Sequence, residues 1–165
     1  MEIWDAYYKD ETKANYDLIR GEKIPKGFYH LVCEILVKHI DGSYLLMQRD
    51  LNKETFPGKY EASAGGSSLK GETPIKCAIR ELKEETGITT TSLEEIYHIV
   101  SDENQRIYHG YLCIVDCDKD SIILQEGETI SYKWLDKEEF ISFVNSDEYA
   151  GAHGKRLKGY IDKIK

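Results

Sequence analysis

The densest group of titratable side chains lies in residues 71–88, which read GETPIKCAIRELKEETGI. At about 100° per residue along a helix, Glu81, Glu84 and Glu85 fall on one face, with Arg80 at its edge. Like-charged pairs at this spacing destabilise a helix by roughly 0.2–0.5 kcal/mol each, and the chain already has a net charge of -8. Carboxylate oxygens so arranged suit Mg²⁺ or Mn²⁺. The face therefore predicts a divalent-cation site, and the alternative is an acidic face open to solvent.

Local signals predict that this segment is a helix. Thr73 is a suitable N-cap, Pro74 takes the first helical position, and Gly87 provides the stop. The remaining side chains divide into an apolar stripe, expected to face the core, and a solvent sector. The stripe consists of Ile75, Ala78, Ile79 and Leu82, and the solvent sector holds Lys76 and Lys83. Because the acidic face borders the apolar stripe, we expect it to be partly shielded from water.

The rest of the chain predicts strands interleaved with helices. A hairpin is expected around Asp41-Gly42, because two β-rich runs flank this two-residue turn signal. The strands are expected at 29–40, at 43–49, twice within 93–117 around a turn at 102–105, and at 129–135, with an extra strand possible at 2–8. Such hairpins next to helices predict a mixed sheet covered by helices, which is the α+β class.

Two further helices and two irregular segments complete the prediction. One helix is expected at 136–146, with Asp136 as its N-cap, and a terminal helix at 149–165. Residues 51–60 predict a loop that turns at Pro57-Gly58, and residues 61–68, EASAGGSS, predict a small, flexible segment. We find no repeat or linker, so we expect a single domain over residues 1–165.

Composition limits the classes of partner. The chain has 165 residues, of which 41% are hydrophobic and 32% charged, and no run approaches the roughly 20 apolar residues of a membrane span. The start of the chain lacks the features of a secretion signal, so we expect a cytoplasmic protein without a membrane partner. The acidic balance argues against a nucleic acid polymer. A monomer and a homodimer both remain open.

The acidic helix also carries a known pattern. Gly66 is followed after five residues by Glu72, and after seven more by Arg80-Glu81-Leu82, then Glu84-Glu85, and Gly87-Ile88. This spacing resembles the Nudix box, and every defined position of the box is filled in residues 66–88. The resemblance implies the family's α/β/α sandwich, with a mixed sheet between helices.

The resemblance implies a hydrolase that cleaves a diphosphate linkage with water activated by Mg²⁺, with Mn²⁺ as a possible substitute. Metal ions would neutralise the phosphate oxygens and lower the pKa of a water molecule. Carried over residue by residue, the metal ligands are Glu84 and Glu85, with Glu81 as a ligand or as the base. A backbone carbonyl near Gly66 is a further expected ligand.

Two other box residues each have two expected roles. Glu72 is expected to tie the loop to the helix or to join the shell of a second metal. Arg80 is counted with the catalytic group because it would orient Glu81 and Glu84, although a structural role fits it equally well. The base varies within the family, so Glu128 in the loop before residues 129–135 competes with Glu81, and Glu126 lies close enough to be a third candidate.

Segments around the box resemble a narrower group, the Nudix proteins related to isopentenyl-diphosphate isomerase. The shared features include the run LLMQR and a lysine ahead of TFPG. The resemblance places Arg49 and Lys53 near the substrate diphosphate, as a planar fork and a point charge respectively; the alternative is a solvated strand end and loop. The isomerase itself needs a Cys-Gly-His run where this chain has Gly65-Gly66-Ser67, so hydrolysis fits better than isomerisation.

The sequence therefore favours a hydrolase of a small nucleoside-diphosphate-type compound. The alternatives are an isomerase-like enzyme and an inactive Nudix domain that binds a nucleotide and regulates another process. Of the family's isomerase metal ligands only His30 is matched, and we expect it to be structural or to form a wall of the pocket. Aromatic side chains that could stack on a base are Tyr60, Tyr108, Tyr111 and Trp134.

Overall fold

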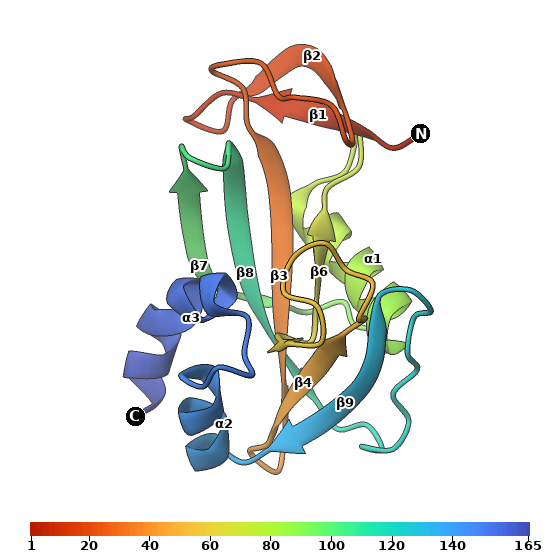
Figure 1. Cartoon of the computed structure of the whole chain (residues 1–165), viewed down its shortest axis with the longest axis vertical. Coiled ribbons are helices and arrows are strands. Elements are labelled where there is room, and N and C mark those ends of the chain that lie inside the picture. Colours follow the sequence, from red (N-terminus) through yellow and green to blue (C-terminus); the bar gives the residue numbers. More distant parts are fainter.

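The computed structural model describes residues 1–165 and shows a twisted mixed sheet with helices on both faces (Figure 1). The strands of this sheet are β3 (His30–His39), β4 (Tyr44–Arg49), β5 (Tyr60–Glu61), β6 (Ala64–Ser67), β7 (Glu94–Ser101), β8 (Arg106–Val115) and β9 (Thr129–Leu135). Their order is β5-β4-β3-β8-β7, with β6 also paired to β3 and β9 to β4. Only β3 and β8 are parallel, so the sheet is mixed, as predicted.

The helices enclose two separate apolar cores. They are α1 (Pro74–Thr86), α2 (Lys137–Val144) and α3 (Gly151–Ile164). Leu82 of α1 packs with Ile35 on one face of β3, whereas Phe140 and Leu157 pack with Leu36 on the other. Successive strand residues point to opposite faces, which is why neighbours in β3 serve different cores. The predicted α+β sandwich is confirmed. None of these helices combines the length and apolar character that a membrane crossing requires.

The N-terminal segment forms a hairpin outside the main sheet, at the top of Figure 1. Its strands are β1 (Ile3–Tyr7) and β2 (Lys13–Ile19), which pair with each other. The hairpin is joined to the main sheet by a bridge between Tyr7 and Tyr29 and by Trp4, whose ring stacks on His30 at 4.3 Å. The sequence predicted only the first of these strands, because polar side chains dominate the second.

Two other expectations are wrong. Residues 61–68 are not a flexible segment, because β6 pairs with β3 from Val32↔Ser67 to Ile35↔Ala64. Ile75 does not face the core, since 40% of its surface is exposed. The buried face of α1 is instead formed by Cys77, Ala78, Leu82, Glu85 and Thr86. The helix is therefore rotated so that it turns two acidic side chains, rather than a fourth apolar one, toward the sheet.

The expected helix ends are confirmed. The Thr73 side chain accepts a hydrogen bond from the Lys76 backbone N–H, and Pro74 begins α1. Gly87 ends the helix with a φ of 79°, and its N–H donates to the Lys83 carbonyl. A residue without a side chain adopts this left-handed conformation at little cost. These ends fix which residues of the box lie on the helix, and hence the angular positions of its carboxylates.

The contact between the hairpin and the main sheet should be sensitive to acid. His30 is 3% exposed, and burial, with the Arg106 charge beside it, lowers its pKa to about 3. Since the unfolded state takes up this proton near pH 6.5 and the folded state does not, stability should fall as the pH drops from 6.5 toward 3. The loss should be roughly 1.4 kcal/mol per pH unit, or about 2 kcal/mol between pH 6.5 and 5.

Replacing His30 with Phe keeps a ring against Trp4 and removes the titration. Denaturant unfolding at pH 6.5 and at pH 5 should show a smaller loss of stability in His30→Phe than in the wild type, by about 2 kcal/mol. The buried His153 contributes to the slope of both proteins and cancels in the comparison. Equal slopes in the two proteins would contradict the prediction.

Candidate active site

Two carboxylates of α1 lie against the glycine-containing strand β6. Glu81 and Glu85 are one helical turn apart, and both point toward the sheet rather than into solvent. A Cβ atom placed on Gly66 would lie only 2.3 Å from Glu81 Oε1, so any side chain at that position would displace the Glu81 carboxylate. The Gly65 N–H lies 3.4 Å from Glu85 Oε1 and donates to it. The absence of side chains at Gly65 and Gly66 therefore lets both acids approach the backbone of β6.

Glu81 and Glu85 repel each other, and burial disfavours the charge of both. Glu85 is 7% exposed, and burial, the Glu81 carboxylate and Glu61 raise its pKa well above the ordinary value. Burial also raises the pKa of Glu81, although Arg80 acts in the opposite direction. The third acid, Glu84, differs because 45% of its side chain is exposed. The predicted acidic face thus consists of the buried Glu85, the largely buried Glu81, whose side chain is 14% exposed, and Glu84 at the rim.

Arg80 organises the carboxylates around it. Its Nη1 donates to Glu81 Oε1 at 2.8 Å and to Glu84 Oε2 at 3.2 Å. Its Nε and Nη2 donate to the two oxygens of Glu72 at 2.5 and 3.0 Å. Although burial alone would raise it, these bonds and one from the Leu69 N–H lower the pKa of Glu72. The structure therefore places Glu72 and Arg80 together as a bridge between the loop after β6 and the helix.

The donor set suits a hard divalent cation. Glu81, Glu84 and Glu85 offer carboxylate oxygens from one helix, and neither buried acid has a cation within reach besides Arg80. The Gly66 carbonyl lies 3.7 Å from the Cys77 sulfur, on the side of β6 that faces the helix. Oxygen ligands without imidazole or thiolate match Mg²⁺ and Mn²⁺. The carboxylates that the sequence predicts as metal ligands lie together on one helix face, and their chemistry fits such an ion.

The predicted substrate cations are already paired with acids. Arg49 Nη1 donates to Glu61 Oε1 at 2.7 Å, and Lys53 forms an ion pair with Glu128. Thus a residue expected to bind diphosphate and a residue expected to act as base contact each other. Glu126, the third candidate base, is exposed in the same loop. Of these residues only Arg49 and Glu61 line the cleft described next.

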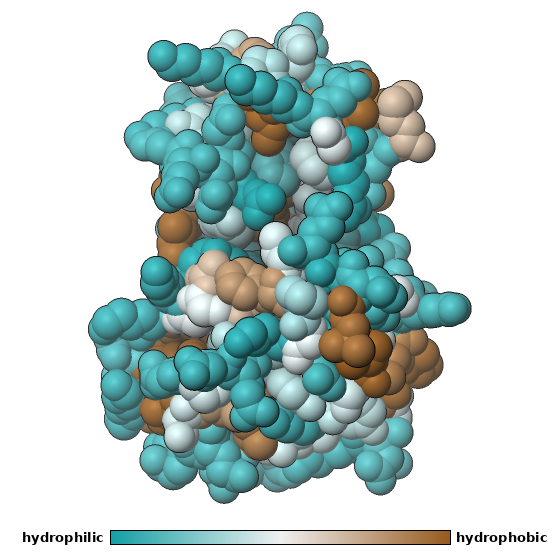
Figure 2. Space-filling view, viewed as in Figure 1, coloured by the Kyte–Doolittle hydropathy of each residue, from teal (hydrophilic) through white to brown (hydrophobic).

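A cleft of about 490 Å³ lies between β3, β6, β8, α3 and the loop after β4. Gly65 and Gly66 form part of its wall, so the cleft meets the carboxylate pair across β6. The charged residues of its lining are Arg20, Arg49, Arg106, Arg156, Glu34 and Glu61. Arginine side chains thus collect at one place on an acidic chain whose visible face in Figure 2 is mostly hydrophilic. An anionic ligand would be attracted to this cleft.

Arg106 differs from the other arginines of the cleft. The other three form ion pairs, with Glu2, Glu61 and Glu34. Arg106 instead donates through Nε to the neutral ring of His30 at 3.1 Å, and no carboxylate pairs with it. Its Nη1 lies 3.5 Å from the Tyr108 hydroxyl. It is therefore the arginine of the cleft whose charge is free to meet a phosphate.

An anchored aromatic residue lines the same cleft. The Arg156 guanidinium lies 4.0 Å above the Tyr108 ring and donates two bonds to Glu34, at 2.7 and 2.6 Å. Tyr97 donates a third bond to Glu34 at 2.7 Å. The Tyr97 ring can take this position only because Gly110 has no side chain. A Cβ atom built on Gly110 would lie 2.2 Å from the ring. Tyr108, which is 3% exposed, is thus a fixed part of the cleft wall, with the guanidinium over its ring.

The other three predicted aromatic residues are placed elsewhere. Tyr111 packs in the core beneath α1. Trp134 donates from its indole to the Lys119 carbonyl, and Tyr60 packs edge-on against Phe143. Sequence reasoning did not single out Glu34, Glu61, Arg106 or Arg156. Glu34, an acid inside the otherwise apolar run LVCEILV, was the available signal, because a charge there needs a buried partner.

The family follows from a comparison with known domains. The model of the NUDIX domain matches residues 29–157 of the chain. The chain belongs to the Nudix family. An uncharacterized Nudix hydrolase of Listeria innocua is 32% identical over 154 residues, covering 90% of this chain and 88% of the relative. This Nudix protein is accordingly an enzyme of the hydrolase group that acts on diphosphate bonds.

The narrower resemblance is also found among relatives. An isopentenyl-diphosphate Delta-isomerase of Corynebacterium diphtheriae is 29% identical over 130 residues, covering 73% of this chain and 71% of the isomerase. The Nudix protein nevertheless has Gly65-Gly66-Ser67 at the place where the isomerase pattern needs cysteine and histidine. His30, which matched an isomerase ligand, is stacked on Trp4 and bonded by Arg106.

Solved structures agree on the fold. DR0079 from Deinococcus radiodurans superposes with a TM-score of 0.78 over 96% of this chain and 99% of that one, at 17% identity. The NUDIX domain of NrtR from Shewanella oneidensis, solved with ADP ribose, gives a TM-score of 0.65 at 16% identity, over 92% and 95% of the two chains. At these identities the likeness concerns the arrangement of the sheet and helices around the box.

Proposed function

We propose that this Nudix protein is a Mg²⁺-dependent hydrolase that cleaves the diphosphate linkage of a small nucleoside-diphosphate-type compound. One observation carries the proposal: Glu81 and Glu85 lie against the same glycines that line an arginine-rich cleft. A diphosphate in the cleft would reach the cation-binding acids where no side chain intervenes. The cleft supplies positive charge for phosphate, and the helix supplies negative charge for the cation.

The residues near the cleft have separate roles in binding the cation and activating water. Glu84 and Glu85, with the Gly66 carbonyl, would hold the cation, and Glu81 would be a further ligand or the base; when bound, the cation neutralises phosphate charge and lowers the pKa of a water molecule. Arg80 keeps Glu81 in place. Glu81 is our candidate for the base, ahead of Glu128, because it is in contact with a wall of the cleft. Lys53 holds Glu128 outside the cleft lining.

The substrate class follows from the mixture of groups in the cleft. Arg106 suits phosphate oxygens, and Phe56, which lines the cleft and is 41% exposed, presents an aromatic surface suited to a nucleobase. The Shewanella oneidensis domain that shares this fold was solved with ADP ribose, a compound with a base and a diphosphate. For this chain we propose the class of ligand, a small nucleotide. We do not assign ADP ribose itself.

A ³¹P NMR assay tests the activity. The purified protein would be incubated with Mg²⁺ and, separately, with nucleoside triphosphates, sugar nucleotides, dinucleotides and isopentenyl diphosphate. New phosphate signals that require Mg²⁺ are expected with a nucleotide substrate, and their chemical shifts identify the bond that breaks. Chromatography of the isopentenyl sample separates hydrolysis from isomerisation. An unchanged spectrum with every nucleotide, together with an isomerised alkene, would replace the proposal with the isomerase alternative.

Replacing Arg106 with Gln should weaken substrate binding. A charge-assisted hydrogen bond contributes about 1.5–3 kcal/mol, so KM should rise about 10- to 100-fold, with a smaller change in kcat. Lys158→Gln, which removes a positive charge from the exposed side of α3, is the control and should leave KM unchanged. Steady-state kinetics of both variants make the comparison. A KM for Arg106→Gln within twofold of wild type would remove this residue from the substrate site.

We further propose a cytoplasmic location and a single Nudix domain that acts as a monomer or homodimer. The four cysteines support the location, because all are free and three are buried. Reduced thiols persist in a reducing compartment.

A further inference from the structure

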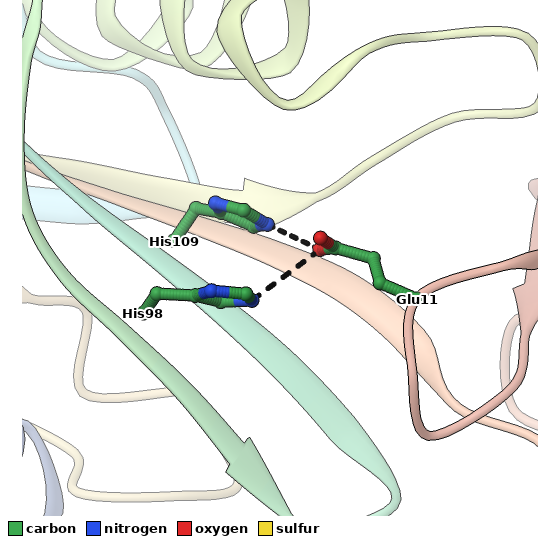
Figure 3. Close-up of side chains that lie close together, drawn as sticks. All are labelled: Glu11, His98 and His109. Atoms are coloured by element: carbon green, nitrogen blue, oxygen red, sulfur yellow. Dashed lines mark hydrogen bonds and ion pairs between the residues drawn. The ribbon is translucent and has the colours of Figure 1, made fainter.

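Three side chains outside the active site converge near the N-terminal hairpin. Glu11 lies in the turn between β1 and β2, whereas His98 of β7 and His109 of β8 are cross-strand partners. Figure 3 shows both imidazole rings directed at the carboxylate of Glu11. The ligand atoms of the three residues all lie within 4.8 Å of one another. None of these residues belongs to the Nudix box or lines the cleft.

The two rings present the same nitrogen to the same oxygen. His98 Nε2 lies 3.6 Å from Glu11 Oε1, and His109 Nε2 is in contact with that oxygen as well. The rings are stacked, with centroids 4.4 Å apart and planes 18° from parallel. Cross-strand pairing fixes both histidines on one face of the sheet. Two nitrogens and one oxygen are therefore held at the corners of a small triangle.

Glu95 acts on the far side of His109. Its Oε1 lies 3.2 Å from His109 Nδ1, so this ring stands between two carboxylates. A neutral imidazole has one N–H and can donate to only one of them. If a metal ion occupied Nε2, the single proton would sit on Nδ1 and be donated to Glu95. A carboxylate that orients a histidine in this way is the usual outer partner of a zinc ligand.

We propose that Glu11, His98 and His109 form a second metal site, which binds Zn²⁺ or a similar divalent transition metal. Two imidazoles and one carboxylate make a known zinc ligand set, in which water completes the tetrahedron. Imidazole ligands favour zinc over Mg²⁺, which prefers oxygen. The side chain of His98 is 45% exposed and that of Glu11 28%, so an ion and its water can enter from solvent.

The site would fasten the hairpin to the main sheet. Glu11 has a φ of 67°, in the left-handed region that non-glycine residues seldom adopt. Its turn is also held by Lys9, which pairs with Asp102 of the β7–β8 turn at 2.8 Å. That lysine pair is exposed and contributes little stability. A metal ion would therefore be the stronger of the two links between this turn and the strands β7 and β8.

Co²⁺ and Zn²⁺ titrations distinguish this site from the active site. The oxygen ligands of the box favour six-coordinate Co²⁺, whose visible absorption is weak, whereas the proposed site should give the intense absorption of tetrahedral Co²⁺. In ¹⁵N-edited NMR, Zn²⁺ should shift the ring nitrogens of His98 and His109, and Mg²⁺ should not. The wild-type protein should show both signatures at one ion per site.

Variants then assign the signatures to the residues. His98→Ala and Glu11→Gln alter exposed or half-buried side chains and should leave the fold intact, as circular dichroism would verify. Each should weaken Zn²⁺ binding at the tetrahedral site by at least about 100-fold, and Glu95→Gln by about tenfold. Glu94→Gln is the control, because the neighbouring Glu94 points to the other face of β7. Its affinity for Zn²⁺ should match that of the wild type.

Two results would overturn the proposal. One is the absence of the tetrahedral Co²⁺ spectrum in the wild-type protein, with no shift of the histidine nitrogens. The other is a tetrahedral site whose affinity is unchanged by His98→Ala and Glu11→Gln, which would place the ion elsewhere.

Discussion

Glu85→Gln should abolish diphosphate cleavage and make the metal-free protein more stable. The bound cation contributes several kcal/mol to stabilising the charge of the transition state, and losing about 4 kcal/mol lowers a rate roughly 1000-fold. Glutamine has the same shape but removes the charge that burial, Glu81 and Glu61 all oppose. We therefore expect at least a 1000-fold loss of kcat, together with a rise in melting temperature in EDTA.

The stability gain tests the electrostatic account independently of activity. Relief of about 1–2 kcal/mol should raise the melting temperature by roughly 2–8 °C in a chain of this size. Glu138→Gln removes a carboxylate whose side chain is 83% exposed and which lies in the first turn of α2, so its activity should equal that of wild type and its melting temperature should not rise. A Glu85→Gln protein with more than a tenth of wild-type activity would show that this carboxylate does not hold the catalytic ion.

Gly66→Ala should inactivate the enzyme through a single methyl group. The added Cβ would lie 2.3 Å from Glu81 Oε1 and 2.4 Å from its Cδ, so the carboxylate must move. It would then leave the position in which Arg80 holds it at 2.8 Å. A displacement of about 1 Å in a catalytic group can lower the rate about 100-fold. We expect a loss of that size in kcat, with only a small change in stability, because the displaced atoms are the end of a flexible side chain.

Gly159→Ala provides the matched control for this variant. No atom lies within 4 Å of a Cβ built on Gly159, and alanine is favoured over glycine inside a helix by about 1 kcal/mol. This variant should be fully active and slightly more stable. If Gly66→Ala kept at least half of the wild-type kcat, contact between β6 and Glu81 would not matter for catalysis, and the proposed role of Glu81 would have to be withdrawn.

Local signals in the sequence were sufficient for the elements around the box. Thr73, Pro74 and Gly87 place the ends of α1 because caps depend on neighbours within a few residues. The hairpin at Asp41-Gly42 and the capping box of Asp136 with Glu139 are equally local. The spacing of the box acids on one helix also brought Glu81, Glu84 and Glu85 together.

Features that depend on distant contacts were beyond such reasoning. The rotation of α1 that exposes Ile75 is set by β6, where two glycines leave room for carboxylates on a side that a core normally fills with apolar groups. Glu34 and Arg156 are 122 positions apart and meet only in the folded chain. Arg106 becomes the free charge of the cleft because its neighbour is the neutral His30 rather than an acid. No pattern within a single segment indicates these pairings.

The parallel pairing of β3 with β8 has a consequence for synthesis on the ribosome. His30 pairs with Arg106, which follows it by 76 positions, and the box helix lies inside the loop that this pairing closes. At about 5–20 residues per second, β8 emerges roughly 4–15 s after β3. During that interval the carboxylates of the helix and the strand β6 against which they lie have been translated, but the sheet that β6 joins through β3 still lacks β8. The nascent chain must therefore wait for its second half before the catalytic half can close.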